Sequence, residues 1–279
     1  MKKYLRSTGY SFCQLGVITV STALALSMEA FADDLASKAT NPIGDMIQVQ
    51  MQYQHSPDVW NLDGHSDAAI VQPVVPVDLP FEWMPKMITR TTVPYVTTPK
   101  LPGVGSVDGL GDTVVLAFGL PELGLKGQMF GFGPALGLDT ASEDETGSGR
   151  WSAGPAAVYI NLQTKGMMWG LMSYGLWDYA GDDDREHVAQ INIQPVLNKF
   201  FANGWYLGLQ DVPWTFDDNT NKWNIPIGPR AGKVVHFGSQ AVNIFGGAYY
   251  NAEDTDGTGK WTYKLSFSFL FPEKTVSPP

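Results

Sequence analysis

Cysteine is nearly absent from this chain of 279 residues. Cys13 is the only one, and it precedes the apolar run from Leu15 to Leu26. The lipid-bearing cysteine of a lipoprotein leader follows the apolar run, so Cys13 cannot take that role. Once such a leader is removed no cysteine remains, which excludes disulfides, thiol catalysis and cysteine-based metal sites.

Charge is also scarce, because only 16% of the residues are charged and the net charge is -10. The first 32 residues carry Lys2, Lys3, Arg6 and Glu29, a net +2, so the remainder carries -12. Proteins that bind nucleic acid usually carry a basic surface patch, and a chain this acidic gives no sign of one. A glycine-rich phosphate loop before a helix is missing as well, so we expect neither a nucleotide site nor a cofactor.

The amino terminus has the features of a secretory leader. A cationic start with Lys2 and Lys3 is followed by the apolar run, and Ala30-Phe31-Ala32 offers small residues at both cleavage-determining positions. The run is about a dozen residues, shorter than the roughly 20 that a spanning helix needs. We therefore predict a signal peptide over residues 1–32, with an uncleaved inner-membrane anchor as the alternative.

Beyond the leader no apolar run reaches helix-spanning length, and the mean hydropathy is -0.10. Instead, several segments alternate strictly between apolar and polar residues. From Ile47 to Gln54, apolar residues alternate with four glutamines, and similar patterns run from Ala189 to Leu197 and from Lys264 to Phe271. A period of two indicates strands rather than helices. A membrane barrel gives this weak signal because its strands alternate lipid-facing and lumen-facing residues.

Turn residues divide the rest of the chain into further strands. We predict an all-β fold, a transmembrane up-and-down antiparallel β-barrel of about twelve strands, which is an even number as in bacterial outer-membrane barrels. Connections after odd strands are long and acidic, whereas those after even strands are short. The predicted strands lie near residues 46–55, 67–78, 86–97, 111–120, 127–138, 151–162, 167–178, 187–198, 204–214, 222–234, 240–251 and 260–271.

The polar face of these strands favours a barrel over a soluble sandwich. A sandwich face in bulk water usually carries Lys and Glu, whereas here it carries Gln, Asn, Ser, Gly and Tyr. Tryptophans near the predicted strand ends fit an aromatic girdle, although they could also cap the strands of any β-protein. These are Trp151, Trp169, Trp177, Trp205, Trp214, Trp223 and Trp261.

Prolines inside the predicted strands oppose a regular barrel, because each removes a donor from the hydrogen-bond ladder. We expect bulges or bends at several of Pro73, Pro76, Pro94, Pro134, Pro155, Pro195 and Pro226.

The predicted organisation has three parts after the leader. Residues 33–45 form an N-terminal segment with a short helix before Pro42, residues 46–271 form the barrel, and residues 272–279 form a tail. Three alternatives stay open for the first part: it plugs the lumen, lies in the periplasm, or is a disordered lead-in.

Several short motifs resemble one family. They are Asn41-Pro42-Ile43-Gly44-Asp45-Met46-Ile47, Gln72-Pro73-Val74-Val75-Pro76, Thr89-Arg90-Thr91-Thr92-Val93-Pro94, Gly109-Leu110-Gly111-Asp112, Gly147-Ser148-Gly149-Arg150-Trp151, Ala180-Gly181-Asp182-Asp183-Asp184 and Phe269-Leu270-Phe271-Pro272. Together they look like the outer-membrane transporters grouped under the heading "MetA pathway of phenol degradation". The resemblance implies a β-barrel and a transport role, and it supplies no catalytic residues.

The end of the chain resembles the signal that the barrel-assembly machinery reads. Lys264, Phe269 and Phe271 match it, Ser266 replaces its usual glycine, and residues 272–279 follow it.

Two arginines are the candidate functional residues. Arg90 and Arg230 lie well inside predicted strands and share parity with Thr92 and Asn224, which turns both toward the lumen. We expect this inward orientation because a charge facing hydrocarbon costs roughly 2 to 4 kcal/mol. The functional hypothesis is a selectivity constriction in which the arginines face Asp112 and lumen amides; the alternative is a network that holds a narrow barrel closed. The amide candidates are Gln48, Gln50, Gln52, Gln190, Asn192 and Gln194.

Histidines and acidic runs suggest two weaker hypotheses. A barrel hydrolase could pair His65 with Asp63 or Ser66, or His187 with Asp184 or Glu186, but neither spacing is a known signature. The runs Glu143-Asp144-Glu145 and Asp182-Asp183-Asp184 lack the spacing of an EF-hand loop and are more typical of solvated charge. We predict neither catalysis nor a metal site.

The sequence thus predicts a porin-like channel of the Gram-negative outer membrane that takes up small molecules passively. Its expected partners are membrane lipid and lipopolysaccharide, the assembly machinery and a small-molecule substrate. The family heading favours aromatic or hydrophobic compounds, whereas the glutamines favour polar ones. The alternatives are a barrel hydrolase with a loop histidine and a plugged structural or adhesive barrel.

Overall fold

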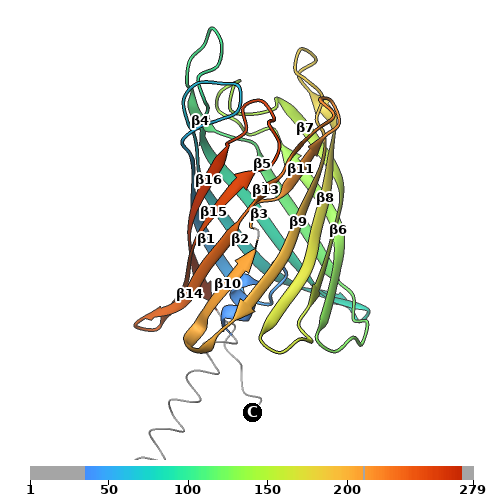
Figure 1. The fold of residues 1–279 in the computed structure, drawn as a ribbon. Coiled ribbons are helices and arrows are strands. Elements are labelled where there is room, and N and C mark those ends of the chain that lie inside the picture. Colours follow the sequence, from blue (N-terminus) through green and yellow to red (C-terminus); the bar gives the residue numbers. More distant parts are fainter. Residues whose placement is uncertain (1–34, 210, 272–279) are drawn as a thin grey trace, which may run out of the picture.

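The computed structural model describes residues 35–209 and 211–271, which form one closed antiparallel barrel (Figure 1). The predicted count of twelve barrel strands is confirmed. The leader predicted over residues 1–32 and the tail predicted over residues 272–279 lie outside the described residues.

Ten of the twelve barrel strands consist of one main segment each: β1 (Ile47–Ser56), β2 (Ser66–Phe81), β3 (Met84–Thr97), β5 (Thr113–Leu120), β6 (Gln128–Leu138), β7 (Arg150–Asn161), β8 (Met167–Gly181), β9 (Ala189–Phe200), β15 (Gln240–Asn251) and β16 (Trp261–Phe271). The short β4 (Asp108–Leu110) adds to the edge of β3. β1 pairs with β16 from Ile47 opposite Phe271 to His55 opposite Tyr263, which joins the two ends of the sheet.

The ninth and tenth barrel strands are broken. The ninth consists of β10 (Trp205–Leu209) and β11 (Trp214–Asp217), and both pair with β9. The tenth consists of β12 (Lys222–Asn224), β13 (Pro226–Ile227) and β14 (Pro229–Phe237). Pro213, Pro226 and Pro229 cluster at these breaks, where each removes a ladder donor. The prediction of continuous strands over 204–214 and 222–234 is therefore wrong.

At the other prolines the predicted distortion is mostly wrong. Pro76, Pro94 and Pro195 pair in register with Ile88, Ile70 and Leu171, and Pro134 lies directly opposite Pro155. The register of β2 and β3 is also the same on both sides of Pro73. These prolines cost single ladder bonds without shifting the strands, and of the seven only Pro226 lies at a break.

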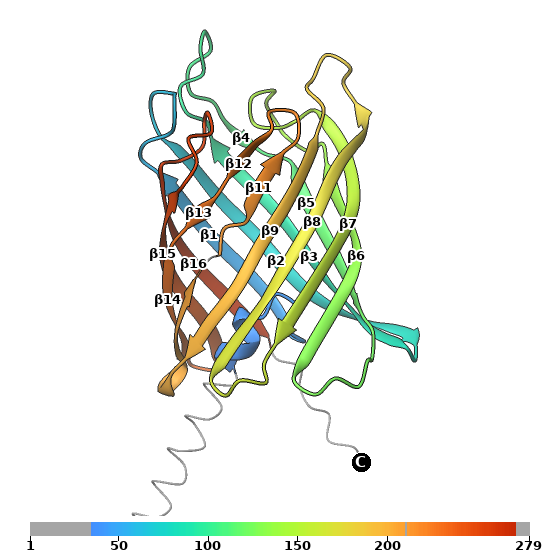
Figure 2. The ribbon, with the colours of Figure 1, turned by 45° about the vertical axis from the view of Figure 1, so that its right-hand side comes forward.

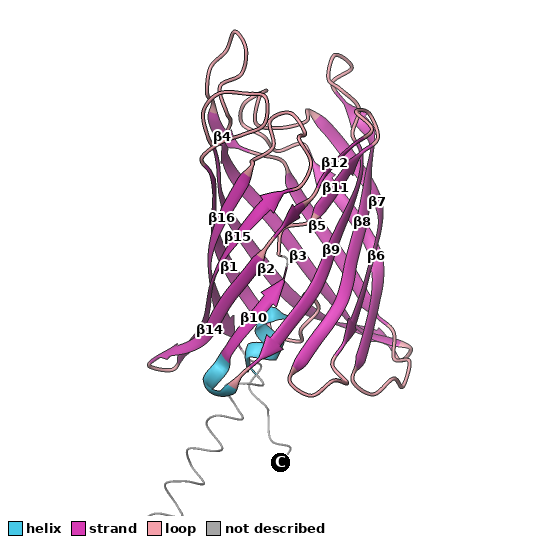
Figure 3. Ribbon diagram, viewed as in Figure 1, coloured by secondary structure: helices cyan, strands magenta, loops and turns pink. Residues whose placement is uncertain are grey.

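The two ends of the barrel differ, as the sequence predicted. The connections at the top of Figure 1, which we call the loop end, are mostly long: 57–65, 98–107 before β4, 139–149, 182–188, 218–221 and 252–260. The connections at the turn end are mostly short: 82–83, 121–127, 162–166, 201–204 with the 3-10 turn η1 (Ala202–Gly204), and 238–239. Figure 3 shows the contrast between the two ends.

The outer face of the barrel is apolar. Large apolar side chains on strands all around the barrel are exposed, including Met51 (50%), Val71, Phe132, Leu171, Leu207 (53%) and Phe267. Exposed tryptophans lie near strand ends: Trp151, Trp177 and Trp261 at the loop end, Trp169 and Trp205 at the turn end. Water would disfavour so large an apolar surface, whereas hydrocarbon matches it.

The N-terminal segment lies inside the turn end. Residues 35–40 are helical, and Figure 2 shows this helix within the lower part of the barrel. Leu35, Ala36 and Ala39 are buried against Tyr206 and Phe245 of the wall. The described residues of this segment therefore lie within the lumen at the turn end. No helix in the described part of the chain is long and apolar enough to cross a membrane.

The lumen has two chemically different walls. Strands β2, β3 and β5 to β9 contribute an apolar cluster, into which Ile43 of the N-terminal segment also packs. Strands β1, β2, β9 and β14 to β16 contribute a polar wall that includes Gln48, Gln52, Asn198, Asn243 and Ser266, all buried. The expectation of amides and hydroxyls all around the interior holds for part of the second wall only, because Val234, Ala241, Phe245 and Leu270 of the same strands are apolar and pack on the N-terminal helix. The members of the apolar wall include Ile88, Leu116, Phe118, Ile160, Met168, Met172 and Leu176.

Candidate functional site

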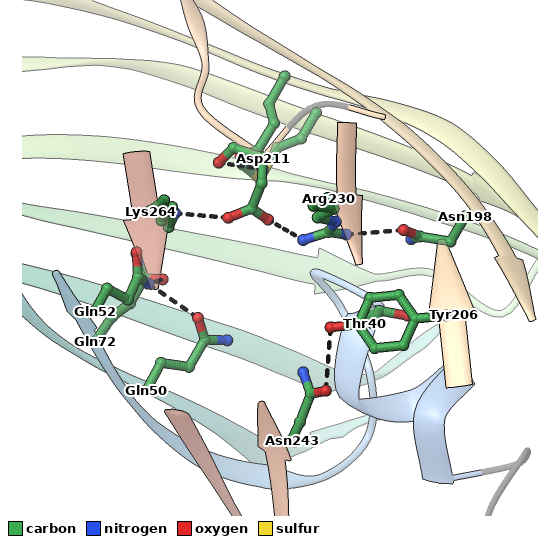
Figure 4. A network of polar contacts seen from close by, with 12 residues as sticks. Thr40, Gln50, Gln52, Gln72, Asn198, Tyr206, Asp211, Arg230, Asn243 and Lys264 are labelled. Carbon is green, nitrogen blue, oxygen red and sulfur yellow. Dashed lines mark hydrogen bonds and ion pairs between the residues drawn. The ribbon is translucent and has the colours of Figure 1, made fainter. Parts of the chain in front are cut away.

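The centre of the polar wall is a carboxylate in the break of the ninth strand. Asp211 lies between β10 and β11, and its Oδ2 accepts a hydrogen bond from Lys264 Nζ at 2.6 Å. Its Oδ1 accepts another from Arg230 (Figure 4). The three side chains are between 4% and 15% exposed, so the ion pairs lie inside the barrel. One carboxylate thus joins the ninth, tenth and twelfth barrel strands.

Arg230 is held by groups other than Asp211 as well. Its Nη2 donates to Asn198 Oδ1 at 2.9 Å, and its guanidinium lies 5.1 Å from the centre of the Phe245 ring. Tyr206, at 5.8 Å, forms a second aromatic neighbour and donates its hydroxyl to Asn243. These contacts fix the guanidinium against the wall.

Glycine at position 208 makes room for this arrangement. A Cβ there would come within 2.3 Å of Asn198 Oδ1 and 2.9 Å of Arg230 Nε. Both distances are shorter than van der Waals contact, so a larger residue would push the amide or the guanidinium away.

Arg90 reaches the same region from β3. Its Nη2 donates to Gln72 Oε1 at 3.0 Å, and its Nη1 lies 3.9 Å from Met172 Sδ of the apolar wall. Among the described residues no carboxylate lies within 4 Å of this guanidinium. Arg90 therefore stands where the two walls meet, with a neutral amide in place of an anionic partner.

The glutamines of β1 form a chain of hydrogen bonds that leads to Gln72. Gln52 Nε2 donates to Gln50 Oε1 at 3.1 Å and to Gln72 Oε1 at 2.9 Å, and Gln50 Nε2 reaches Gln48 Oε1 at 3.4 Å. Gln72 donates in turn to Thr92 Oγ1 at 2.6 Å. The alternation of the first strand predicted that these amides face inward, and the structure shows them bonded to one another.

A small cavity of about 40 Å³ lies among these groups. Arg90, Asp211 and Arg230 line it together with Val196 and Phe245, and residues 39–42 of the N-terminal segment close one side. A buried water needs about 10 to 15 Å³, so this space holds roughly three. The N-terminal segment therefore limits the size of the cavity.

Charge in this region is unbalanced. Lys264, Arg230 and Arg90 bring three cations, and Asp211 brings the only carboxylate that ion-pairs with any of them in the described chain. The sum is +2, in a protein whose net charge is -10. A low-dielectric interior makes such an excess costly unless anions or water compensate it.

The predicted site residues fall into two groups. Arg90 and Arg230 do face the lumen, as do Gln48, Gln50, Gln52, Asn192 and Gln194, whereas Gln190 lies nearer the loop end. Gln194 Nε2 donates to the Asp211 carbonyl oxygen at 3.4 Å, and Asn192 Oδ1 accepts from Thr215. Their selectivity role stays a prediction.

Asp112 is not part of this region, which corrects the predicted constriction. It lies in the connection before β5 at the loop end, and its Oδ2 accepts hydrogen bonds from the backbone N–H and the hydroxyl of Ser148, both at 2.6 Å. Its Oδ1 accepts from the backbone N–H groups of Thr140 and Ala141, both at 3.3 Å. Asp112 therefore holds the 139–149 loop.

Two residues of the cluster, Asp211 and Lys264, are not among the lumen residues predicted from the sequence. Asp211 shares parity with Trp205, Leu207 and Leu209, which all face outward, so a continuous strand would place its carboxylate in lipid. Lys264 matches the assembly signal, and its inward parity with Ser266 is the sequence feature that indicates its lumen position. Phe269 and Phe271 lie on the opposite, outer face of β16.

In the structure, both histidines of the hydrolase hypothesis lie beside carboxylates other than the predicted ones. His65 Nε2 lies 3.4 Å from Asp67, and His187 Nδ1 lies 2.9 Å from Asp178. In residues 35–209 and 211–271 neither histidine side chain hydrogen-bonds to a serine. Within the same ranges no group of three or more His, Cys, Asp or Glu is arranged to hold a metal ion.

Comparison with known proteins supports the fold. A crystal structure of an outer membrane channel from Pseudomonas putida F1 is similar, with a TM-score of 0.60, 15% sequence identity, and coverage of 83% of this chain and 98% of that chain. No family model and no curated protein matches the sequence. The likeness shows a shared barrel fold, and the phenol-degradation grouping stays a prediction.

Proposed function

We propose that this protein is a channel of the bacterial outer membrane through which small molecules pass without an energy source. The observation that carries the proposal is the inversion of polarity: exposed apolar side chains surround the barrel, while charged and amide groups line a cavity inside it. Such a barrel is suited to lipid outside and water inside. The similar channel from Pseudomonas putida F1 supports the same role.

The width of the lumen argues for a selective channel. Twelve strands enclose less space than the sixteen or more of open porins. The N-terminal segment and the apolar wall fill much of that space, and the cavity beside Arg90 holds only a few waters. Passage of anything larger requires the N-terminal segment to move.

The two walls favour substrates that have both apolar and polar parts. The resemblance to transporters grouped with phenol degradation agrees with an apolar or aromatic body, and the polar wall agrees with a polar substituent. Membrane lipid, lipopolysaccharide and the barrel-assembly machinery are the proposed partners.

A plugged structural barrel is the second candidate, because residues 35–46 pack closely inside the turn end. Recordings in planar lipid bilayers separate the two. Protein refolded in detergent is first checked for the heat-dependent gel mobility of a closed barrel and is then added to the bilayer. Discrete conductance steps support the channel. Folded protein that inserts without conductance, and that gives no solute flux in liposomes, contradicts it and leaves the plugged barrel.

A further inference from the structure

We infer that the cavity beside Arg90 is an anion site in the lumen, which takes the carboxylate of a small organic acid on the Arg90 guanidinium, with Arg230 and Lys264 adding positive charge nearby. This inference rests on the proposed channel function and adds a substrate class to it. Its starting point is the excess charge, since Arg90, Arg230 and Lys264 bring three positive charges, and Asp211 pairs with only the last two of them.

Arg90 is the cation that a ligand would meet. Asp211 already accepts hydrogen bonds from Lys264 and Arg230, whereas the guanidinium of Arg90 is held by Gln72 and contacts Met172. A guanidinium has five N–H donors in a planar fork that matches a carboxylate. Arg90 lines the cavity with such a fork and, in the described chain, makes no ion pair within 4 Å.

The remainder of the cavity explains why an organic anion suits it better than an inorganic one. Val196 and Phe245 contribute apolar surface to the same space, and Gln50 and Gln194 contribute amides. The cavity of about 40 Å³ admits a carboxylate head. A longer apolar body would extend along the apolar wall once residues 39–42 give way.

Selectivity of the channel is the first measurement. In a planar bilayer with a KCl gradient, the reversal potential of the wild type should show that chloride permeates better than potassium, despite the acidic chain. Arg90→Gln should lower this permeability ratio about fivefold, the effect of one unit charge at contact distance in water. Arg90→Lys keeps the charge and should keep most of the ratio. Lys100→Gln, which removes an exposed cation at the loop end, is the matched control and should change little.

Binding is the second measurement, and it does not require conduction. Benzoate and acetate should raise the thermal unfolding temperature of the protein in detergent, whereas benzamide and acetamide at the same ionic strength should not. Arg90→Gln should abolish the shift, while Lys100→Gln should retain it.

The outcomes are distinguishable. A folded wild type that does not conduct removes the proposed channel, but a carboxylate-specific thermal shift lost in Arg90→Gln still supports the anion site. A conducting channel that prefers potassium, or a ratio that Arg90→Gln leaves unchanged, overturns the inference. Equal shifts with the acids and their amides overturn it as well.

Discussion

Asp211 lies 2.6 Å from Lys264, and this ion pair ties a break in the ninth barrel strand to the last strand of the sheet. Both side chains are buried, at 15% and 4% exposed. A buried pair gains little over a well-packed apolar pair, but removing one member leaves the other charge uncompensated. The pair therefore makes the barrel sensitive to substitution at a place where the backbone ladder is already interrupted.

Replacing Asp211 should weaken the barrel more than replacing an exposed ion-pair partner. Asp211→Ala leaves Lys264 and Arg230 without their carboxylate, and we expect a loss of about 3 kcal/mol in the free energy of unfolding. Urea unfolding in detergent, followed by tryptophan fluorescence, measures it. Lys222→Gln removes a pair whose members are 46% and 69% exposed, and it should cost less than about 1 kcal/mol. Equal losses in the two variants would contradict the structural role of Asp211.

Gly208 should tolerate no side chain. Gly208→Ala places a Cβ within 2.3 Å of Asn198 Oδ1, so the hydrogen bond from Arg230 to Asn198 must shift. We expect a loss of about 1 to 3 kcal/mol, as for other overpacked sites. Gly246→Ala is the control, because its Cβ would meet only the Lys264 carbonyl oxygen at 3.8 Å. The same unfolding assay compares them, and an unchanged midpoint for Gly208→Ala argues against this packing.

Part of this architecture could be predicted from the sequence. The alternation of Gln48 to Gln54 and the inward parity of Arg90 and Arg230 follow from a repeat of two, which any paired strand imposes. Twelve strands and unequal connections also followed from turn residues. Patterns of this kind are local, and the structure bears them out where the strands are continuous.

Asp211 shows why the rest could not be predicted. Parity alone places its side chain with outward Leu209, but residues 211–213 lie outside the sheet, which the chain re-enters at Trp214. Pro213 marks the break, yet the prolines at 94, 134 and 195 stay in register. Whether a proline breaks a strand depends on its neighbours in space. The same holds for the apolar wall, because inward residues such as Met172 are identified only once the opposite strands are known.

Removing the N-terminal segment should open the pore. Residues 35–45 fill the turn end and close one side of the cavity, so a variant lacking them should conduct in larger steps than the wild type. Single-channel recording measures the step size. Heat-dependent gel mobility must first show that the shortened chain still forms a closed barrel. A folded variant with wild-type steps would place the narrowest part of the pathway elsewhere.

The closed conformation of the 139–149 loop should depend on Asp112 and not on nearby acidic side chains in general. The carboxylate of Asp112 accepts four hydrogen bonds from this loop, two of them from Ser148. Hydrogen bonds to a charged group contribute about 1.5 to 3 kcal/mol, so their loss in Asp112→Ala should raise the open population of the loop at least about tenfold.

A glutamyl endopeptidase can report on that opening, because Glu143 and Glu145 lie within the loop. Cleavage of the folded protein in detergent should be about tenfold faster for Asp112→Ala than for the wild type, provided that reclosing outpaces cleavage. Asp184→Ala, which removes an exposed carboxylate from the neighbouring loop, should cleave at the wild-type rate. Arg185 binds the carbonyl oxygens of Gly147 and Ser148 and remains in both variants. If it alone suffices to hold the loop, Asp112→Ala will be as resistant as the control, and the role assigned to Asp112 is wrong.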